Sequence, residues 1–546
     1  MKSLRPWVGM TLLAYATAVH ANEPSNFEVQ AAEAAAAAAL PDTLNRAKNI
    51  ILFVGDGMGV TTVTAARILD GQNQGNTGEE NSLFFERFPF TALSKTYAIN
   101  QQTPDSASTM TAMVTGHKTK GYVISYDADV ILNDHTSTQP FGGASRPVET
   151  LVEQFEKEGR ATGIVTTTRL THATPACCYA HSASRNWEDH YYDEEKTAHL
   201  PLIKALKAGF KDIALQLVEF PYGDGIDVAL GGGRRGFLPS PPPDQEADAL
   251  KWGRRLDNRN LVQEWNRREG GAYVENRQQL LELEVSGETK LLGLFHEADL
   301  TFEIEMMDEE TRSQPTLAEM ATTALSVVEK NENGFFLMVE GGRIDHGHHL
   351  SSAARALTET LEFDRAVRAV YEALSEDQRA ETLIIVTADH SHTFTIAGYP
   401  TRGNPILGKV IANDSQGQPE SQAKLDALGL PYTTVSYANG PGSTAMVIDK
   451  ETLSLSPGGH HDDHAKDILD GKLKYFRVPV DPRPNLTPHD TTDPHYIQEG
   501  RVPMAAETHG GEDVAIYATG PGAHLFRGTR EQNYIYHAIQ VALKGF

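Results

Sequence analysis

The sequence predicts an α/β protein with a large, mostly parallel sheet sandwiched by helices. Four short apolar runs each end abruptly in acidic, glycine or histidine residues, and stretches with helical periodicity separate them. Runs this short between helices are typical of buried strands in a parallel sheet. Residues 404–506 are instead rich in Pro, Gly, Asp and His and have weak periodicity, which predicts an irregular insertion beside the sheet.

The expected strands are the apolar runs NIILFV (49–54), GIVTTT (163–168), GFFLMV (334–339) and TLIIVT (382–387). Helices over 148–159 and 351–374 are expected to cover the faces of the sheet. Open α/β sheets bind ligands at the carboxyl ends of their strands. We therefore expect a functional site where the polar residues follow these runs.

The first 21 residues have the layout of a secretory signal peptide. Lys2 and Arg5 precede an apolar run that ends in Val19-His20-Ala21, so cleavage is expected after Ala21. The alternative is a buried N-terminal helix. The run is too short to span a bilayer, and no later segment is long and apolar enough. We expect a periplasmic or secreted protein whose residues 22–546 form a single domain, with 404–506 as a crown-like insertion.

The net charge of the chain excludes two classes of partner. Lys and Arg number 48 and Asp and Glu 73, a net charge of −25, which argues against nucleic-acid readout and against an anionic membrane as partner.

The two cysteines, Cys177 and Cys178, are adjacent. A disulfide between neighbours is strained, and zinc sites want wider spacing, so both are expected to be free, buried thiols.

Carboxylates and histidines after the strands point to metal. Asp56, Glu340 and Asp389 follow or end three of the apolar runs. In EGGRIDHGHH (340–349), Asp345 and His349 are four residues apart, so one helical turn places both on one face.

The motifs ADHSH and ETHGGED add two further imidazoles, His390 and His509. Carboxylate oxygen and imidazole nitrogen are ligands that zinc accepts. Each motif alone is equally well explained by helix capping or a solvated loop. Together they favour a metal site.

Ser106 is the candidate nucleophile. It follows Pro104-Asp105 at the expected start of a helix. Ordinary N-capping, worth about 1 kcal/mol, is the alternative explanation. A helix N-terminus also favours an alkoxide and an incoming phosphate. The chain has no G-x-S-x-G elbow and no P-loop, and GDGMG (55–59) is not a dinucleotide fingerprint, so metal coordination is the natural means of activating this serine.

Six motifs together resemble the alkaline phosphatase family. They are VGDGMG, PDSA, VTTTRLTHATPA, EGGRIDHGHH, TADHSH and ETHGGED, in the order of the family. The chain is more similar to the animal type than to the enteric bacterial type. The resemblance covers nearly all of the chain after the leader and is weak around 70–82, 127–147, 188–205, 238–260 and most of 404–506. It implies an alkaline-phosphatase-like fold.

The resemblance also implies two zinc ions and one magnesium ion. One zinc would be bound by Asp345, His349 and His509. The second would be bound by Asp56, Asp389 and His390, with Ser106 when deprotonated. Magnesium would be bound by Asp56, Thr174, Glu340 and waters. Arg185 would bind the phosphoryl oxygens as a bidentate fork, and His172 and His346 would stand just behind the ligands, where enteric enzymes have Asp and Lys.

Calcium is one cofactor to which the resemblance does not extend. Animal members have a further calcium site, whose Phe-Glu pair is interrupted here as Phe295-His296-Glu297 and whose aspartate is replaced by Gln314. The stretch GGHHDDH (458–464) is interpreted as a solvated loop, with binding of a divalent ion as the alternative.

The implied activity is hydrolysis of small phosphomonoesters through a phosphoserine, with low specificity because the phosphate is the part recognised. The family's habit implies a homodimer. Rivals in the same superfamily are a phosphodiesterase, a sulfatase and a cofactor-independent phosphoglycerate mutase. Sulfatases need a C/S-x-P-x-R setting, which Ser106 lacks, and a diesterase would lack Arg185. A rival of another class is an inactive metal- or phosphate-binding protein of the cell envelope.

Overall fold

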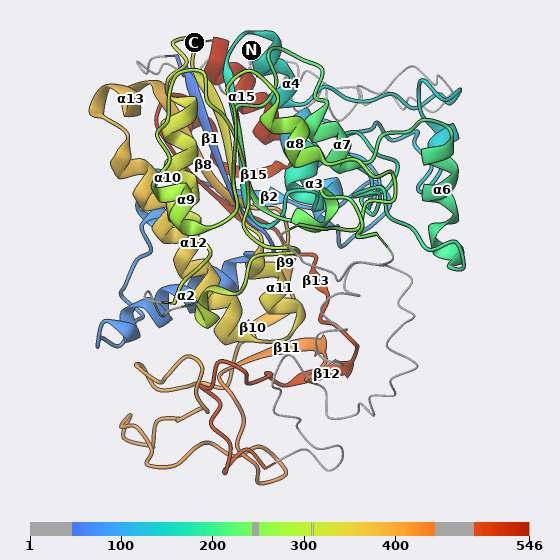
Figure 1. Ribbon diagram of the computed structural model, residues 1–546. Coiled ribbons are helices and arrows are strands. Elements are labelled where there is room, and N and C mark those ends of the chain that lie inside the picture. The colour runs from blue at the N-terminus through green and yellow to red at the C-terminus, as the bar shows by residue number, and fades with distance from the viewer. Residues whose placement is uncertain (1–45, 243–250, 307, 309–310, 443–484, 545–546) are drawn as a thin grey trace, which may run out of the picture.

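A ten-stranded sheet lies between two layers of helices in the computed structural model, as predicted (Figure 1). The structure describes residues 46–242, 251–306, 308, 311–442 and 485–544. The expected signal peptide and the His-rich stretch 458–464 lie outside these residues. Within them, no helix is long and apolar enough to cross a bilayer.

The strand order of the large sheet is β15-β2-β14-β8-β1-β7-β3-β4-β6-β5. All pairs are parallel except those of β14, which runs antiparallel to β2 and β8. The strands are β1 (Asn49–Gly55), β2 (Phe90–Lys95), β3 (Ala161–Arg169), β4 (Val228–Gly232), β5 (Gly271–Val274), β6 (Lys290–Leu294), β7 (Phe335–Gly341), β8 (Thr382–Ala388), β14 (Val514–Thr519) and β15 (Gly528–Glu531). The four strands expected from the sequence are the adjacent central strands β8, β1, β7 and β3.

Both faces of the central strands are buried, which explains why their sequences are continuously apolar. In β1, Ile50, Leu52 and Val54 face one helical layer, and Ile51 and Phe53 face the other. The first layer consists of α3 (Ser106–Thr115), α4 (Leu151–Lys157), α5 (Ala173–Tyr179), α7 (Ile213–Val218), α8 (Leu261–Asn266) and α15 (Tyr534–Lys544). The second consists of α2 (Val60–Asn73), α9 (Arg277–Leu281), α10 (Leu317–Val328) and α12 (Ala353–Ala373).

The predicted helices are present with bounds set by their caps. The helix expected over 148–159 is α4, which begins after Thr150 because Thr150 and Glu153 form a reciprocal capping box. The helix expected over 351–374 is α12. The other α-helices of the described residues are α6 (Leu200–Lys207), α11 (Arg343–His349) and α13 (Glu376–Glu381).

Two small sheets lie beside the large one. The strands β10 (Phe394–Ile396), β11 (Val435–Gly440) and β12 (Gly500–Pro503) form the first, so the described part of 404–506 is anchored to the chain that follows β8. The second pairs β9 (Ser391–His392) with β13 (His509–Gly510). Figure 1 shows both below the end of the large sheet, next to α11.

Candidate metal centre and nucleophile

Three neighbouring strands deliver carboxylates to one edge of the sheet. The last residue of β1 is in register with the last residues of β7 and β8. Asp56 and Asp389 therefore follow adjacent strands at the same level, and Glu340 is one residue before the end of β7. All three are fully buried. This is the carboxyl edge of the parallel strands, where the sequence predicts the site.

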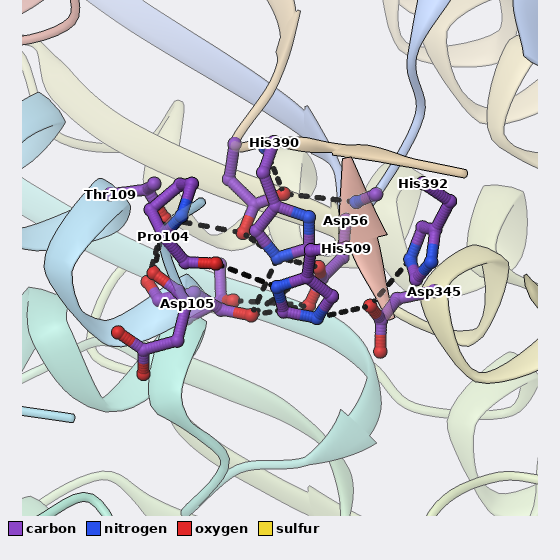
Figure 2. A network of polar contacts seen from close by, with 12 residues as sticks. Asp56, Pro104, Asp105, Thr109, Asp345, His390, His392 and His509 are labelled. Carbon is purple, nitrogen blue, oxygen red and sulfur yellow. Dashed lines mark hydrogen bonds and ion pairs between the residues drawn. The ribbon is translucent and has the colours of Figure 1, made fainter. Parts of the chain in front are cut away.

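A first cluster joins α11 to β13. Asp345 and His349 meet across one helical turn, with Oδ1 and Nε2 3.1 Å apart. His509 contributes Nε2 at 3.3 Å from Asp345 Oδ1 and at 3.1 Å from His349 Nε2. The structure thus brings together the three residues expected to share one ion, although His509 lies far along the chain from the other two. Figure 2 shows the contact between Asp345 and His509.

A second cluster contains Asp56, Asp389 and His390, whose ligand atoms lie within 4.8 Å of one another. His390 Nε2 is 3.4 Å from Asp56 Oδ1 and 3.3 Å from Asp389 Oδ2. The His390 ring stacks on the His509 ring with centroids 3.6 Å apart, so the second cluster adjoins the first.

Ser106 reaches into this second cluster from the N-terminus of α3. Its Oγ is 3.3 Å from His390 Nε2 and 3.4 Å from both carboxylate oxygens of Asp56. Asp105 caps the helix by accepting from the amides of Ser108 and Ala107, each at 3.3 Å. Capping and nucleophile placement are therefore compatible: the aspartate is the cap, and the serine is the first helical residue.

A third cluster contains Asp56, Glu340 and His172. Thr174 Oγ1 lies 3.4 Å from Asp56 Oδ2. Glu340 Oε2 accepts from Thr166 and Thr168, whereas its Oε1 is buried and has no hydrogen-bond partner among the described residues. Asp56 is thus common to the second and third clusters.

Arg185 is held beside Ser106 by two partners. Its Nη1 donates to Asp105 Oδ2 at 3.0 Å, and its Nη2 donates to His172 Nε2 at 2.8 Å. His346 lies next to His172, with ring centroids 5.6 Å apart, and Arg343 Nη1 is 2.7 Å from His346 Nδ1.

The electrostatics of the three clusters suit cations. Burial, and then the charges of Asp389 and Asp345, raise the pKa of Asp56 well above its ordinary value. Burial raises the pKa of Glu340 to about 7 and lowers the pKa of His390 well below its ordinary value, which keeps that imidazole neutral. Packed carboxylates, buried imidazoles and a buried carboxylate oxygen without a hydrogen-bond partner among the described residues form a donor set that fits divalent metal ions.

Two buried residues close to the first cluster were not recognised from the sequence. His392 Nε2 is 2.8 Å from Asp345 Oδ1, and His392 Nδ1 is 2.5 Å from Glu507 Oε2. Both lie in motifs that the sequence singles out, ADHSH and ETHGGED. The available signal for His392 was its position two residues after His390 at the end of a strand.

Two further predictions concern the cysteines and a calcium site. Cys177 and Cys178 are free and buried, as expected. Gln314 exchanges two hydrogen bonds with Thr301, at 2.9 and 3.0 Å, where animal relatives were expected to have a calcium ligand. The absence of a calcium site stays a prediction.

Comparison of the sequence with known proteins identifies the alkaline phosphatase family. The family model described as alkaline phosphatase matches residues 47–545. The tissue-nonspecific alkaline phosphatase of Gallus gallus is 42% identical over 505 residues, which cover 91% of this chain and 85% of that protein. The alkaline phosphatase of Gadus morhua is 41% identical over 504 residues, covering 91% of this chain and 92% of its own.

Solved structures share the fold. The alkaline phosphatase of the Antarctic bacterium TAB5 superposes with a TM-score of 0.55 at 20% identity, over 92% of this chain and all of that one. The Thermus thermophilus enzyme superposes with a TM-score of 0.59 at 23% identity, over 92% of this chain and 93% of its own.

The family model and relatives about 40% identical over most of the chain identify one family, and the fold and the clusters of potential metal ligands are consistent with it. The chain therefore belongs to the alkaline phosphatase family, a family of metal-dependent phosphatases.

Proposed function

We propose that the chain hydrolyses small phosphate monoesters, with low specificity, through a phosphoserine at Ser106. The observation that carries this proposal is the position of Ser106 Oγ in the second cluster of potential metal ligands, 3.3 Å from His390 Nε2 and 3.4 Å from Asp56 Oδ1. A serine placed there can be held as an alkoxide without a histidine base.

We also assign the ligands of three ions, on the basis of the three clusters described above and the resemblance to the family. Asp345, His349 and His509 hold one zinc; Asp56, Asp389 and His390 hold the second; and Asp56, Thr174 and Glu340 hold magnesium. When bound, these ions supply positive charge that favours the serine alkoxide and the leaving oxygen. Calcium is not part of this proposal, because His296 interrupts the expected Phe-Glu pair and Gln314 stands in place of the expected aspartate.

The chain's own groups account for the two steps. Ser106 Oγ, after losing its proton to solvent, forms a bond to phosphorus as the bond to the leaving oxygen breaks, and that oxygen takes a proton from solvent and departs as the alcohol. Water then forms a bond to phosphorus as the bond to Ser106 Oγ breaks; one of its protons restores the serine hydroxyl and the other stays with the inorganic phosphate. Arg185, fixed by Asp105 and His172, presents its remaining N–H groups to the non-bridging oxygens, where charge stabilisation contributes most to phosphoryl transfer.

The setting of the enzyme follows from the sequence. The signal-peptide pattern of residues 1–21 supports a periplasmic or secreted enzyme. Residues 22–546 form one domain in this proposal. The large sheet contains both β1 and β15, and strands β11 and β12 of the insertion 404–506 form a small sheet with β10, which follows β8 in the chain. A homodimer is proposed because members of the family are mostly dimeric, and light scattering tests it.

The decisive experiment traps the intermediate. The metal-loaded protein should release phosphate from p-nitrophenyl phosphate and retain a covalent phosphate when quenched in acid. Ser106→Ala should abolish the label and leave the metal content near normal. Ser108→Ala, the next serine of α3, should still label. A Ser106→Ala protein that labels with phosphate would refute the nucleophile assignment.

A further inference from the structure

Glu507 is a buried carboxylate two residues before His509, and none of the ligand assignments above uses it. Its side chain is fully buried. It reaches the first cluster in two ways: its backbone contacts His349 directly, and its carboxylate contacts His392, which in turn contacts Asp345. These two contacts act on different ligands, and each can be followed from atom to atom.

The backbone contact is with His349. The Glu507 amide donates to the carbonyl oxygen of His349 at 2.9 Å, and the Glu507 carbonyl oxygen lies 2.5 Å from His349 Nδ1. A carbonyl oxygen only accepts, so Nδ1 of His349 carries a proton. The lone pair is therefore on Nε2, the atom that faces Asp345 and His509.

The carboxylate contact is with His392. Glu507 Oε2 is 2.5 Å from His392 Nδ1, and His392 Nε2 is 2.8 Å from Asp345 Oδ1. The other oxygen, Oε1, accepts from the amide of Thr393 at 2.6 Å and from its hydroxyl at 2.5 Å. The carboxylate is thus clamped to β9 and its neighbour, and it reaches Asp345 through one imidazole.

Glu507 and His392 are themselves close enough to the clusters to be considered as ligands, since both lie within 4.8 Å of His349. However, the nitrogen atoms of His392 and the carboxylate oxygens of Glu507 already have hydrogen-bonding partners. Both nitrogens of His392 face carboxylates, and both carboxylate oxygens of Glu507 face N–H or O–H groups or that imidazole. This arrangement suits residues that orient ligands rather than residues that bind the ion.

We propose that Glu507 is the positioning residue of the Asp345–His349–His509 centre. Its backbone carbonyl fixes the orientation of His349, and its carboxylate fixes Asp345 by way of His392. The inference rests on the proposed assignment of a zinc ion to these three ligands. Outer partners of this kind typically change metal affinity by about 10- to 100-fold when they are removed.

The test measures zinc release from the full-length, zinc-loaded protein into a chromogenic chelator. Glu507→Gln keeps an oxygen for Thr393 and replaces the oxygen facing His392 with an amide. One zinc per chain should leave at least about tenfold faster, and the other should leave at the wild-type rate. The matched control is Glu512→Gln, since Glu512 lies in the same segment but accepts from the Ser391 hydroxyl at 2.6 Å. This control should release both ions like wild type.

A double-mutant cycle separates positioning from a general loss of packing. If the carboxylate acts through His392, Glu507→Gln should add little to the effect of His392→Ala. The visible spectrum of the cobalt-substituted protein should also change in Glu507→Gln and not in Glu512→Gln. Equal zinc release in Glu507→Gln and wild type, equal acceleration in both glutamine variants, or additive effects in the cycle would overturn the proposal.

Failure of this inference can be told from failure of the proposed function. Zinc release is measured without turnover, so wild-type rates in Glu507→Gln would refute the role of Glu507 and leave the phosphatase intact. Absence of an acid-stable phosphoserine would refute the proposed function and leave the zinc result standing.

Discussion

Arg185 Nη2 donates to His172 Nε2 at 2.8 Å, and this contact decides which nitrogen of the imidazole carries the proton. A guanidinium only donates, so Nε2 accepts and the proton lies on Nδ1. That Nδ1 is buried and has no hydrogen-bond partner among the described residues. Burial, and then the charge of Arg185, lower the pKa of His172 to about 3, so the ring is neutral at any pH at which the enzyme would work.

The first prediction concerns His172 and His346. A lysine ammonium stays charged at alkaline pH, where an ordinary imidazole is neutral. His346→Lys should therefore lower kcat where phosphate release limits turnover, and tighten inhibition by phosphate about tenfold, a gain of roughly 1.4 kcal/mol. The His172→Asp, His346→Lys pair should also respond less to added magnesium. Unchanged phosphate inhibition and magnesium dependence would show that these histidines do not tune the site.

The second prediction separates the clusters by metal content. His509→Ala should lose about one zinc per chain and nearly all activity, because His509 belongs to the first cluster alone. Thr174→Ala, which touches Asp56 from the third cluster, should weaken magnesium and spare zinc. Elemental analysis of the purified variants provides the measurement. Equal zinc in wild type and His509→Ala would rule out this ligand set.

The third prediction concerns the attachment of the insertion. Tyr437 in β11 has its hydroxyl 2.8 Å from His348 Nδ1, and His348 Nε2 is 2.9 Å from Thr62 Oγ1 in α2. Tyr437→Phe leaves a buried nitrogen of α11 unpaired, at a cost of about 1 to 3 kcal/mol in the free energy of unfolding. Denaturant unfolding measures the loss.

Tyr432→Phe is the matched control. Its hydroxyl makes a long bond of 3.4 Å to the carbonyl of Gly398, so this variant should be close to wild type in stability. Equal losses in the two variants would show that the link between β11 and α11 contributes nothing specific.

The fourth prediction is a pH dependence of stability. Burial raises the pKa of Glu156 from an ordinary 4.5 to about 8. Between these values the unfolded chain has released this proton and the folded chain has kept it, so stability falls as the pH rises through the window. Glu156→Gln removes this penalty. Its unfolding temperature relative to wild type should be higher at pH 9 than at pH 5, with both values taken from thermal melts.

Glu153, on the same helix, is expected to make stability depend on pH in the opposite direction. Its bond to His181, at 2.8 Å, holds its pKa below the ordinary value although burial alone would raise it. Its contribution is present above the unfolded pKa and lost as the pH falls, so Glu153→Gln should destabilise the protein at neutral pH. The same pH trend in both variants would contradict these assignments.

The central strands and the strand-end and helical residues of the candidate site could be predicted because both depend on local pattern. Strands buried on both faces are continuously apolar, as in β1, and Asp345 and His349 are one helical turn apart. Asp56 and Asp389 are each recognisable as a carboxylate that follows a buried strand. For these residues a short stretch of sequence contains the signal, whereas the roles of Thr174 and Arg185 and the grouping of the ligands were implied only by the resemblance to the family.

The residues that escaped prediction depend on contacts between distant segments. Glu507 meets His392 only because β13 pairs with β9, and no spacing in the chain indicates that pairing. The second role of Asp105 depends likewise on Arg185, 80 residues away. Asp105 was identifiable as a helix cap, but nothing local shows that it also holds the arginine.

The antiparallel strand β14 imposes an order on assembly. β2, from the first hundred residues, borders only β14 and β15 within the described sheet, and both come from the last forty residues. His509 is synthesised just before them. A chain still emerging from the ribosome can therefore complete neither the sheet edge nor the first cluster. In the proposed assignment of an ion to Asp345, His349 and His509, metal uptake there belongs to the end of folding, after both segments have been made.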